Sequence, residues 1–564
     1  MATYDLLIQG GMVVDGTRLP RYRADIAIKN GRIAKIGRLQ PHEAAKVIDA
    51  HGLIVAPGFI DLHTHYDAQI YWDPYCSISG WHGITSAVIG NCGFGFAPVR
   101  PEERERSMLT MTRVEAIPYA SMKAAMPWDW VTFPEYLNSI ERTPKGINLL
   151  PYVPVAPILI WVMGLDEAKS GRMPTEKETQ EMCRLIHEGM DAGGGGWSAQ
   201  RLGANSLQMD YDGTPMVTDI MHDETCLAFG RVLAERNEGF IQSIFLSTSG
   251  KNEDVQRHYE ELAEVSGRPI LYNVVQATNQ FPERHRNQLE WLERCRKKGL
   301  RIYGQAITTD PGFVFTFEDW NMWDDDPAWR EVTLGTIEER RTKLADPKRR
   351  PALKKDPSGL ISGSFAEIFV HSVKRPDLQG VENLTIVELG QRQGKHPVDA
   401  MLDLAVADNL KTEFYTTVAC SLPLLSEVVR SDLALLGVSD GGAHTKFFTA
   451  GRYPTETIAD LVRQHEVISL EEAHWKLSAM PAWCAGFRDR GTLQEGTPAD
   501  IVVYDYENLK VLPMEIVHDL PGDEWRRVQR AEGYRYILVN GEVTIENDRP
   551  TGATPGKLLR HGHS

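Results

Sequence analysis

Cysteine is scarce in this 564-residue chain, which holds seven cysteines at irregular spacings. The odd number and the spacing do not indicate a disulfide framework, and a reducing compartment fits them better. No run approaches the roughly 20 apolar residues that span a bilayer. The first residues also lack the basic and apolar regions of a secretory signal. We therefore expect a cytoplasmic protein with no membrane partner.

The chain also has fewer basic than acidic residues. The chain has 61 Lys and Arg against 77 Asp and Glu, a formal net charge of −16. Because the basic residues are scattered, no cationic face for a phosphate backbone is expected, and nucleic acid is excluded as a partner. With 42% hydrophobic and 24% charged residues, the composition is that of a globular protein of two or three domains. We expect a small-molecule substrate, and a homo-oligomer stays open.

Short β-prone runs occupy both ends of the chain. Asn30-Gly31 lies between two such runs near the N-terminus, and Asn540-Gly541 lies between two near the C-terminus. Each Asn-Gly pair is typical of a type I′ hairpin turn. Because chain ends commonly lie close together, the pattern predicts one small discontinuous β-sandwich, built from residues 1–56 and 487–564, the latter including a C-terminal tail.

Between residues 57 and 486, apolar runs alternate with helical patterns. This alternation indicates parallel βα units and predicts an α/β fold, a TIM-like (β/α)₈ barrel. The predicted strands include Ala87–Ile89, Asn148–Leu150, Phe240–Ile244, Pro269–Tyr272, Arg301–Tyr303 and Leu433–Leu436.

A segment at about 311–376 breaks this alternation and is rich in Trp, Asp, Lys and Pro. It predicts an inserted lid, with a solvated loop as the alternative. Its aromatic residues are expected to wall the site, or else to form a small core of the insert's own; they are Phe313, Phe315, Trp320 and Trp323.

The stretch from Pro57 to His65 reads as an apolar strand that ends in two histidines. Since side chains alternate along a strand, His63 and His65 point to the same side and Thr64 points away. Two converging imidazoles can begin a divalent-metal site. A pair of structural histidines is an equal alternative on this motif alone.

Two more polar residues, Cys92 and Asp440, closely follow apolar runs. Because the chemistry of this barrel lies at the C-terminal ends of strands, we expect them to meet His63 and His65. Two imidazoles, a thiolate and a carboxylate form a ligand set for Zn²⁺ that leaves a position for water. A carboxylate beside that water can take its proton and pass it to a leaving nitrogen, so Asp440 is predicted as general base and acid.

Together these motifs resemble the amidohydrolase superfamily, most closely its D-aminoacylase (N-acyl-D-amino-acid deacylase) branch. The shared landmarks are Pro57–His65, Asn91–Gly93, Asp440–His444, Arg488–Gly491, Ala499-Asp500, Val539–Gly541 and Thr551–Ala553. The resemblance implies a barrel with a split β domain and a zinc-dependent hydrolase. It also implies that His63 and His65 bind metal, that Cys92 is the cysteine ligand of the branch, and that Asp440 is its catalytic aspartate.

The chain departs from that branch on the fifth and sixth strands. There D-aminoacylases carry histidines that hold a tightly bound zinc ion together with the cysteine. Here Gln242 and Asn273 lie on these strands, with no histidine and no lysine that could be carboxylated. We therefore expect one zinc ion, with two as the alternative. Gln242 and Asn273 are predicted as substrate contacts, with hydrogen bonds inside the protein as the alternative.

Two further residues are candidates for the substrate site. Arg201 follows four consecutive glycines and could pair with a substrate carboxylate through its planar fork, or form a surface salt bridge instead. His444 lies four residues beyond Asp440 and could orient that aspartate or the substrate, or be structural.

The leading hypothesis is hydrolysis of the amide bond of an N-acyl amino acid, or of a similar N-acylated small molecule, by a zinc-activated water. The same barrel hosts hydrolysis of esters, lactones, carbamates and cyclic amides, so these bonds are alternatives. A metal-free, non-catalytic oligomeric scaffold is a third hypothesis. Without a second metal the pocket should be roomier, which predicts a preference for bulky N-acyl groups.

Overall fold

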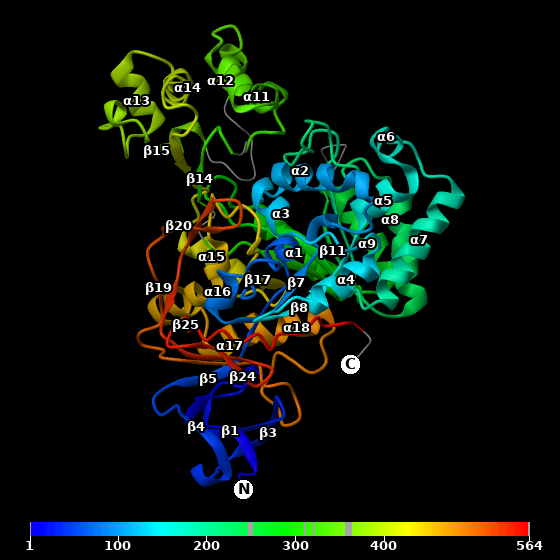
Figure 1. Ribbon diagram of the computed structural model, residues 1–564, viewed down its shortest axis with the longest axis vertical. Helices are drawn as coiled ribbons and strands as arrows, with labels where there is room; N and C mark the ends of the chain where they lie inside the picture. Colours follow the sequence, from blue (N-terminus) through cyan, green and yellow to red (C-terminus); the bar gives the residue numbers. More distant parts are fainter. Residues whose placement is uncertain (1, 246–251, 310–311, 320–321, 356–363, 562–564) are drawn as a thin grey trace.

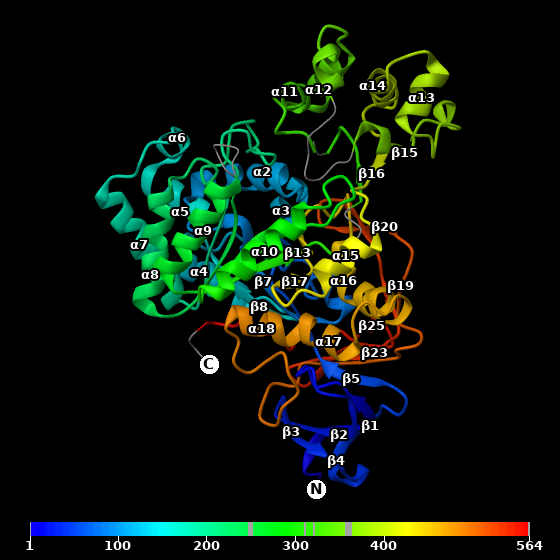
Figure 2. The same ribbon diagram turned by 180° about the vertical axis from the view of Figure 1, so that it is seen from behind.

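The computed structural model describes residues 2–245, 252–309, 312–319, 322–355 and 364–561. A β-rich part lies at one end of the molecule, an α/β part lies in the middle, and a lobe of helices lies at the opposite end (Figures 1 and 2). Among the described residues, no helix combines the length and the apolar character needed to cross a bilayer.

Both chain ends contribute to one nine-stranded sheet, as the alternating runs predict. β5 and β18 pair antiparallel and join the two halves edge to edge. A core of its own lies against this sheet, with Ile26 and Ile501 fully buried. The strands are β1 (Tyr4–Val13), β2 (Tyr22–Lys29), β3 (Arg32–Gly37), β4 (Ala44–Asp49), β5 (Ile54–Pro57), β18 (Ile501–Tyr504), β23 (Tyr534–Val539), β24 (Glu542–Glu546) and β25 (Arg549–Pro550).

Both predicted hairpins are confirmed. Asn30 and Gly31 have φ angles of 51° and 76° between β2 and β3, and Asn540 and Gly541 have 47° and 82° between β23 and β24. A type I′ turn requires positive φ at both central residues, which Asn and Gly tolerate best. Local turn chemistry therefore determines the register of these strands.

The middle part holds parallel strands in the order expected for a barrel. These strands form two separate sheets, one of three strands (β6-β7-β8) and one of six (β9 to β13, followed by β17). At one junction Tyr152 lies between β8 and β9. At the other, an isolated β-bridge joins Thr64 to Gly441. The ladder is thus not continuous around the predicted barrel. The strands are β6 (Phe59–Asp61), β7 (Ile84–Ile89), β8 (Asn148–Pro151), β9 (Val153–Pro154), β10 (Gly196–Arg201), β11 (Phe240–Phe245), β12 (Ile270–Val275), β13 (Ile302–Ala306) and β17 (Ala434–Leu436).

Helices follow these strands and pack around them (Figure 1). Their bounds are α1 (Tyr66–Gln69), α2 (Arg104–Val114), α3 (Tyr119–Ala125), α4 (Phe133–Arg142), α5 (Val155–Met163), α6 (Leu165–Lys169), α7 (Glu176–Asp191), α8 (Asp223–Arg236), α9 (Asn252–Ser266), α10 (Arg284–Lys297), α15 (Leu422–Val429), α16 (Tyr453–Glu456), α17 (Leu470–His474) and α18 (Met480–Ala485). After α18, short strands β19 (Lys510–Val511), β20 (Glu515–Leu520), β21 (Glu524–Val528) and β22 (Ala531–Glu532) precede the C-terminal hairpin.

A compact unit lies between β13 and β17 and forms the lobe at the far end of the molecule (Figure 1). It continues past residue 376 and ends with β16. Its elements are β14 (Phe313–Phe315), α11 (Pro327–Thr333), α12 (Ile337–Ala345), β15 (Phe369–Ser372), α13 (Ile386–Gln393), α14 (Pro397–Ala407) and β16 (Glu413–Thr416).

The aromatic residues of this unit serve its own core. Phe315 and Trp323 are each 1% exposed, and their ring centroids lie 5.4 Å apart; Phe313 belongs to the same buried cluster. For Phe313, Phe315 and Trp323 the structure matches the alternative interpretation, a small core of the insert's own, since large apolar rings are stabilised by burial. Trp320 lies outside the described residues.

A buried ion pair connects the terminal sheet to the α/β part. The Asp500 carboxylate pairs with Arg490 and also accepts hydrogen bonds from Asn148 Nδ2 at 3.1 Å and from the Asn540 backbone N–H at 2.7 Å. Asn148 lies on β8, whereas Asn540 lies in the C-terminal hairpin. This carboxylate therefore holds segments from both parts of the fold.

Replacing Arg490 by methionine is expected to destabilise the protein by about 3–5 kcal/mol, because it leaves the Asp500 charge buried without its cation. The measurement is the midpoint of urea or thermal unfolding. Arg38→Met, at an exposed position directly after β3, is the matched control and should change the midpoint little. Equal midpoints for the two variants would contradict the structural role of the pair.

Candidate functional site

Four of the predicted site residues lie together at the C-terminal ends of three strands. β6 ends at Asp61, so His63 and His65 lie just beyond it rather than on it. Thr64 is held by its bridge to Gly441, which keeps the two imidazoles on the same side. Cys92 follows β7 and Asp440 follows β17.

The backbone at this site is tightly constrained. The His65 N–H donates to the Gly441 carbonyl at 2.6 Å, and a side chain at Gly442 would place its Cβ 2.5 Å from the His65 carbonyl oxygen. Cys92 and Asp440 have φ angles of 58° and 45°, in the left-handed region that costs a non-glycine residue of order 1–3 kcal/mol. Such strain persists where the surrounding structure imposes it, and it is common at functional sites.

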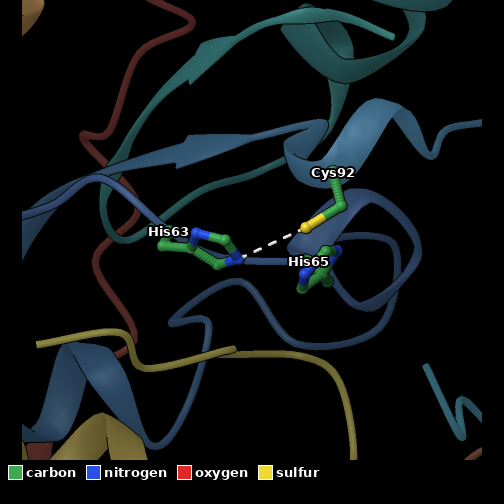
Figure 3. A group of neighbouring side chains, drawn as sticks. All are labelled: His63, His65 and Cys92. Atoms are coloured by element: carbon green, nitrogen blue, oxygen red, sulfur yellow. Dashed lines mark hydrogen bonds between the residues drawn. The ribbon is translucent and has the colours of Figure 1, made fainter. Parts of the chain in front are cut away.

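The donor atoms of His63, His65 and Cys92 lie close enough together to hold one metal ion, and Asp440 lies beside the two histidines. His63 Nε2 lies 3.6 Å from Cys92 Sγ and 3.1 Å from Asp440 Oδ1, and His65 Nε2 lies 3.7 Å from the same oxygen. Donor atoms of His63, His65 and Cys92 all lie within 4.8 Å of one another (Figure 3). Zinc–ligand bonds of about 2.0–2.3 Å in a tetrahedron imply ligand separations of roughly 3.3–3.8 Å. The residues present therefore fit a zinc ion.

The charges of these groups are strongly coupled. Burial would lower the pKa of His63, but the Cys92 thiol and the Asp440 carboxylate raise it to about 10. The pKa of His65 is raised in the same way, against burial, by Glu115 and Asp440. Burial would raise the pKa of Asp440, yet both imidazoles hold it well below its ordinary value. An environment that holds protons on two imidazoles also attracts a divalent cation in their place.

Gln242 and Asn273 contact the predicted ligands directly. The Cys92 backbone N–H donates to Gln242 Oε1 at 2.7 Å, Gln242 Nε2 donates to Asn273 Oδ1 at 3.2 Å, and Asn273 Nδ2 lies 2.9 Å from His63 Nδ1. Since the Cys92 backbone N–H can only donate, the donor and the acceptor of each following hydrogen bond in this series are determined. The two amides thus orient Cys92 and His63, and substrate contact by them stays a prediction.

Gln305 completes the surroundings of His63. Its Oε1 lies 3.3 Å from His63 Nδ1. Because Asn273 Nδ2 approaches the same nitrogen as a donor, at 2.9 Å, Nδ1 accepts that hydrogen bond, and Gln305 on β13 packs beside the ring. No feature of the sequence indicated Gln305.

Glu115 was also not identified from the sequence. It directly follows α2, far from any strand end, and it is 1% exposed. Its Oε1 lies 3.7 Å from His65 Nε2 and its Oε2 lies 3.3 Å from His444 Nε2. His444, a predicted substrate residue, therefore contacts a second buried carboxylate beside the site, through which it reaches His65.

Arg201 lies at the end of β10, a strand that was not predicted because three glycines precede it and a fourth begins it. Its guanidinium pairs with Asp223 and stacks over Phe245, with its carbon 5.0 Å from the ring centroid. It lines a cavity of about 670 Å³ together with the buried His258. The observed ion pair with Asp223 matches the alternative interpretation of Arg201, a salt bridge. Binding of a substrate carboxylate by Arg201 stays a prediction.

Comparison with known proteins identifies the family. The sequence model of the amidohydrolase family matches residues 46–545 of this chain. The chain belongs to the amidohydrolase family. This amidohydrolase is 32% identical over 563 residues to the N-acyl-D-aspartate deacylase of Alcaligenes xylosoxydans xylosoxydans, covering 100% of the chain and 96% of the relative. It is 26% identical over 570 residues to the N-acyl-D-glutamate deacylase of the same organism, covering 99% and 97%.

Solved structures agree on the fold of this amidohydrolase. The N-acyl-D-glutamate deacylase from Bordetella bronchiseptica, complexed with zinc and a phosphonate inhibitor, superposes with a TM-score of 0.67 at 23% identity, covering 99% of this chain and 100% of that one. A D-aminoacylase structure gives a TM-score of 0.69 at 20% identity, with the same coverage. The amidohydrolase thus lies in the D-aminoacylase branch, as its motifs indicated.

Proposed function

We propose that this amidohydrolase is a zinc-dependent deacylase that hydrolyses the amide bond of an N-acyl-D-amino acid. The observation that carries the proposal is the convergence of His63, His65, Cys92 and Asp440 at strand ends, with donor separations of 3.1–3.7 Å between the neighbours measured. The substrate class is supported by the names of the full-length relatives, N-acyl-D-aspartate deacylase and N-acyl-D-glutamate deacylase.

His63, His65, Asp440 and Cys92 would hold the zinc ion. When bound, zinc lowers the pKa of a water molecule to about 7 and polarises a carbonyl oxygen. Asp440 would accept the proton of the attacking water and pass it to the amide nitrogen as the bond to the acyl carbon breaks. Asp440 is the least buried of these residues, with 28% of its side chain exposed, so solvent and substrate reach it.

A substrate panel tests the activity. Purified, zinc-loaded protein should release the free amino acid from N-acyl-D-amino acids, including N-acyl-D-aspartate and N-acyl-D-glutamate, and should act poorly on the L-enantiomers. The panel should include small and bulky acyl groups, together with matched esters and cyclic amides. Hydrolysis of the esters or cyclic amides alone, or no hydrolysis at all, would contradict the proposal.

We further propose a single zinc ion per chain. Support comes from Gln242 and Asn273, which lie at the positions where the resemblance to D-aminoacylases implies histidines and which hydrogen-bond to Cys92 and His63. Neutral amide oxygens are poorer donors to zinc than imidazole nitrogens, so a second tight site has too few ligands here.

Replacing Gln242 and Asn273 together by histidine is expected to raise the zinc content from about one to about two ions per chain. Both side chains already face the predicted ligands, and the new imidazoles would join Cys92 as zinc donors. The measurement is elemental analysis after gel filtration, with Gln242→His alone as the control, which should stay near one. Two ions in the wild type, or one in the double variant, would contradict this proposal.

The domain division follows the sequence patterns: residues 1–56 and 487–564 for the β domain and 57–486 for the barrel with its insert. A cytoplasmic location is part of the proposal. It is supported by the seven cysteines, all of which are free thiols in the structure.

A further inference from the structure

Glu115 is a buried carboxylate with one unsatisfied oxygen. The residue is 1% exposed, and its Oε1 has no hydrogen-bond partner within the described part of the chain. Glu115 forms ion pairs with two histidines of the site, His65 and His444. Buried polar atoms are nearly always satisfied, so an exception calls for a ligand or a functional reason.

The position of Glu115 makes the charge costly. It caps the C-terminal end of α2, an 11-residue helix, where the helix dipole is negative and disfavours a carboxylate. The next residue, Ala116, has a φ of 50°, in the left-handed region. A buried carboxylate at a helix C-terminus requires compensation by a cation.

The geometry aims the free oxygen at the zinc ligands. Glu115 Oε1 lies 3.7 Å from His65 Nε2, the same distance at which Asp440 Oδ1 approaches that nitrogen. The other oxygen, Oε2, lies 3.3 Å from His444 Nε2, and the Glu115 carbonyl accepts the His444 backbone N–H at 2.7 Å. His444 therefore holds the carboxylate so that Oε1 faces His65.

We propose that Glu115 is a further metal ligand, donating Oε1 beside His65 in a chain that lacks histidines at positions 242 and 273. The inference rests on the zinc site of the proposed function. A carboxylate on this ion adds a donor to a ligand set that has no histidine at positions 242 and 273, and the ion gives the buried Oε1 the partner that it lacks. His444 acts as a positioning residue for Glu115.

Zinc affinity tests the proposal without reference to catalysis. Competition with a chromophoric chelator should show that Glu115→Gln binds zinc at least about 10- to 100-fold more weakly than the wild type, since even partners of metal ligands contribute that much. Glu102→Gln, at an exposed position near the start of α2, is the matched control and should bind zinc as the wild type does. His444→Gln should weaken binding less than Glu115→Gln.

A second measurement needs no variant. In crystals of zinc-loaded wild-type protein, the anomalous signal should place the ion about 2.0–2.2 Å from Glu115 Oε1. If zinc binds but lies beyond bonding distance of Glu115, or if Glu115→Gln keeps full affinity, the inference is overturned and the proposed function stands. If the wild type binds no zinc, the proposed function falls and this inference falls with it.

Discussion

Asp440→Asn is expected to lower the turnover number by about 10²- to 10⁴-fold, the usual contribution of acid–base catalysis. Asparagine has nearly the same shape and keeps an oxygen at the Oδ1 position, 3.1 Å from His63 Nε2, but it cannot accept a proton. The measurement is kcat for an N-acyl-D-amino acid in zinc-saturated buffer. Zinc content is determined on the same sample, because Asp440 is also a predicted ligand.

The matched control for this variant is Asp432→Asn. Asp432 lies on the surface, with 65% of its side chain exposed, and pairs with Arg18. This control should keep wild-type turnover. An Asp440→Asn enzyme that retains half of the wild-type kcat with full zinc content would exclude Asp440 as the base.

Replacing His63 and His65 together by alanine is expected to remove zinc and activity entirely. These imidazoles are the two nitrogen donors of the site, and the remaining Cys92 thiol and the carboxylates beside it do not hold the ion at micromolar concentrations without them. The measurements are zinc per chain by elemental analysis and substrate hydrolysis on the same preparation.

The control for the histidine pair is the double variant of His42 and His465 to alanine, since both residues are exposed. It should retain wild-type zinc content, which shows that surface histidines do not account for bound metal. Full activity in a wild-type preparation that contains no metal would contradict the zinc mechanism.

Much of the fold can be predicted from local sequence patterns. The two Asn-Gly turns and the six apolar runs named above correspond to hairpins and strands, because turn geometry and side-chain alternation act over a few residues. β10 was not predicted because glycines occupy its start. The extent of the insert was also missed, since its core joins β14 to β16, about 100 residues apart.

The same logic brought together the predicted ligands. His63, His65, Cys92 and Asp440 each follow a strand, and parallel strands in a barrel deliver their C-terminal ends to one place. Sequence alone therefore indicated the family, through the resemblance of its motifs, and predicted which four side chains meet at the strand ends. The second prediction follows from short-range periodicity and from the barrel topology.

Only the tertiary structure decided what surrounds those four residues. Gln242, Asn273 and Gln305 lie on three different strands, yet they converge on Cys92 and His63. Glu115 reaches His65 from the end of a helix, 50 positions along the chain. Such contacts depend on side-chain directions and on packing between distant segments, and no spacing in the sequence encodes them. The positions of the predicted ligands follow from the strands that precede them, whereas the groups that contact and charge them are brought there only when the chain folds.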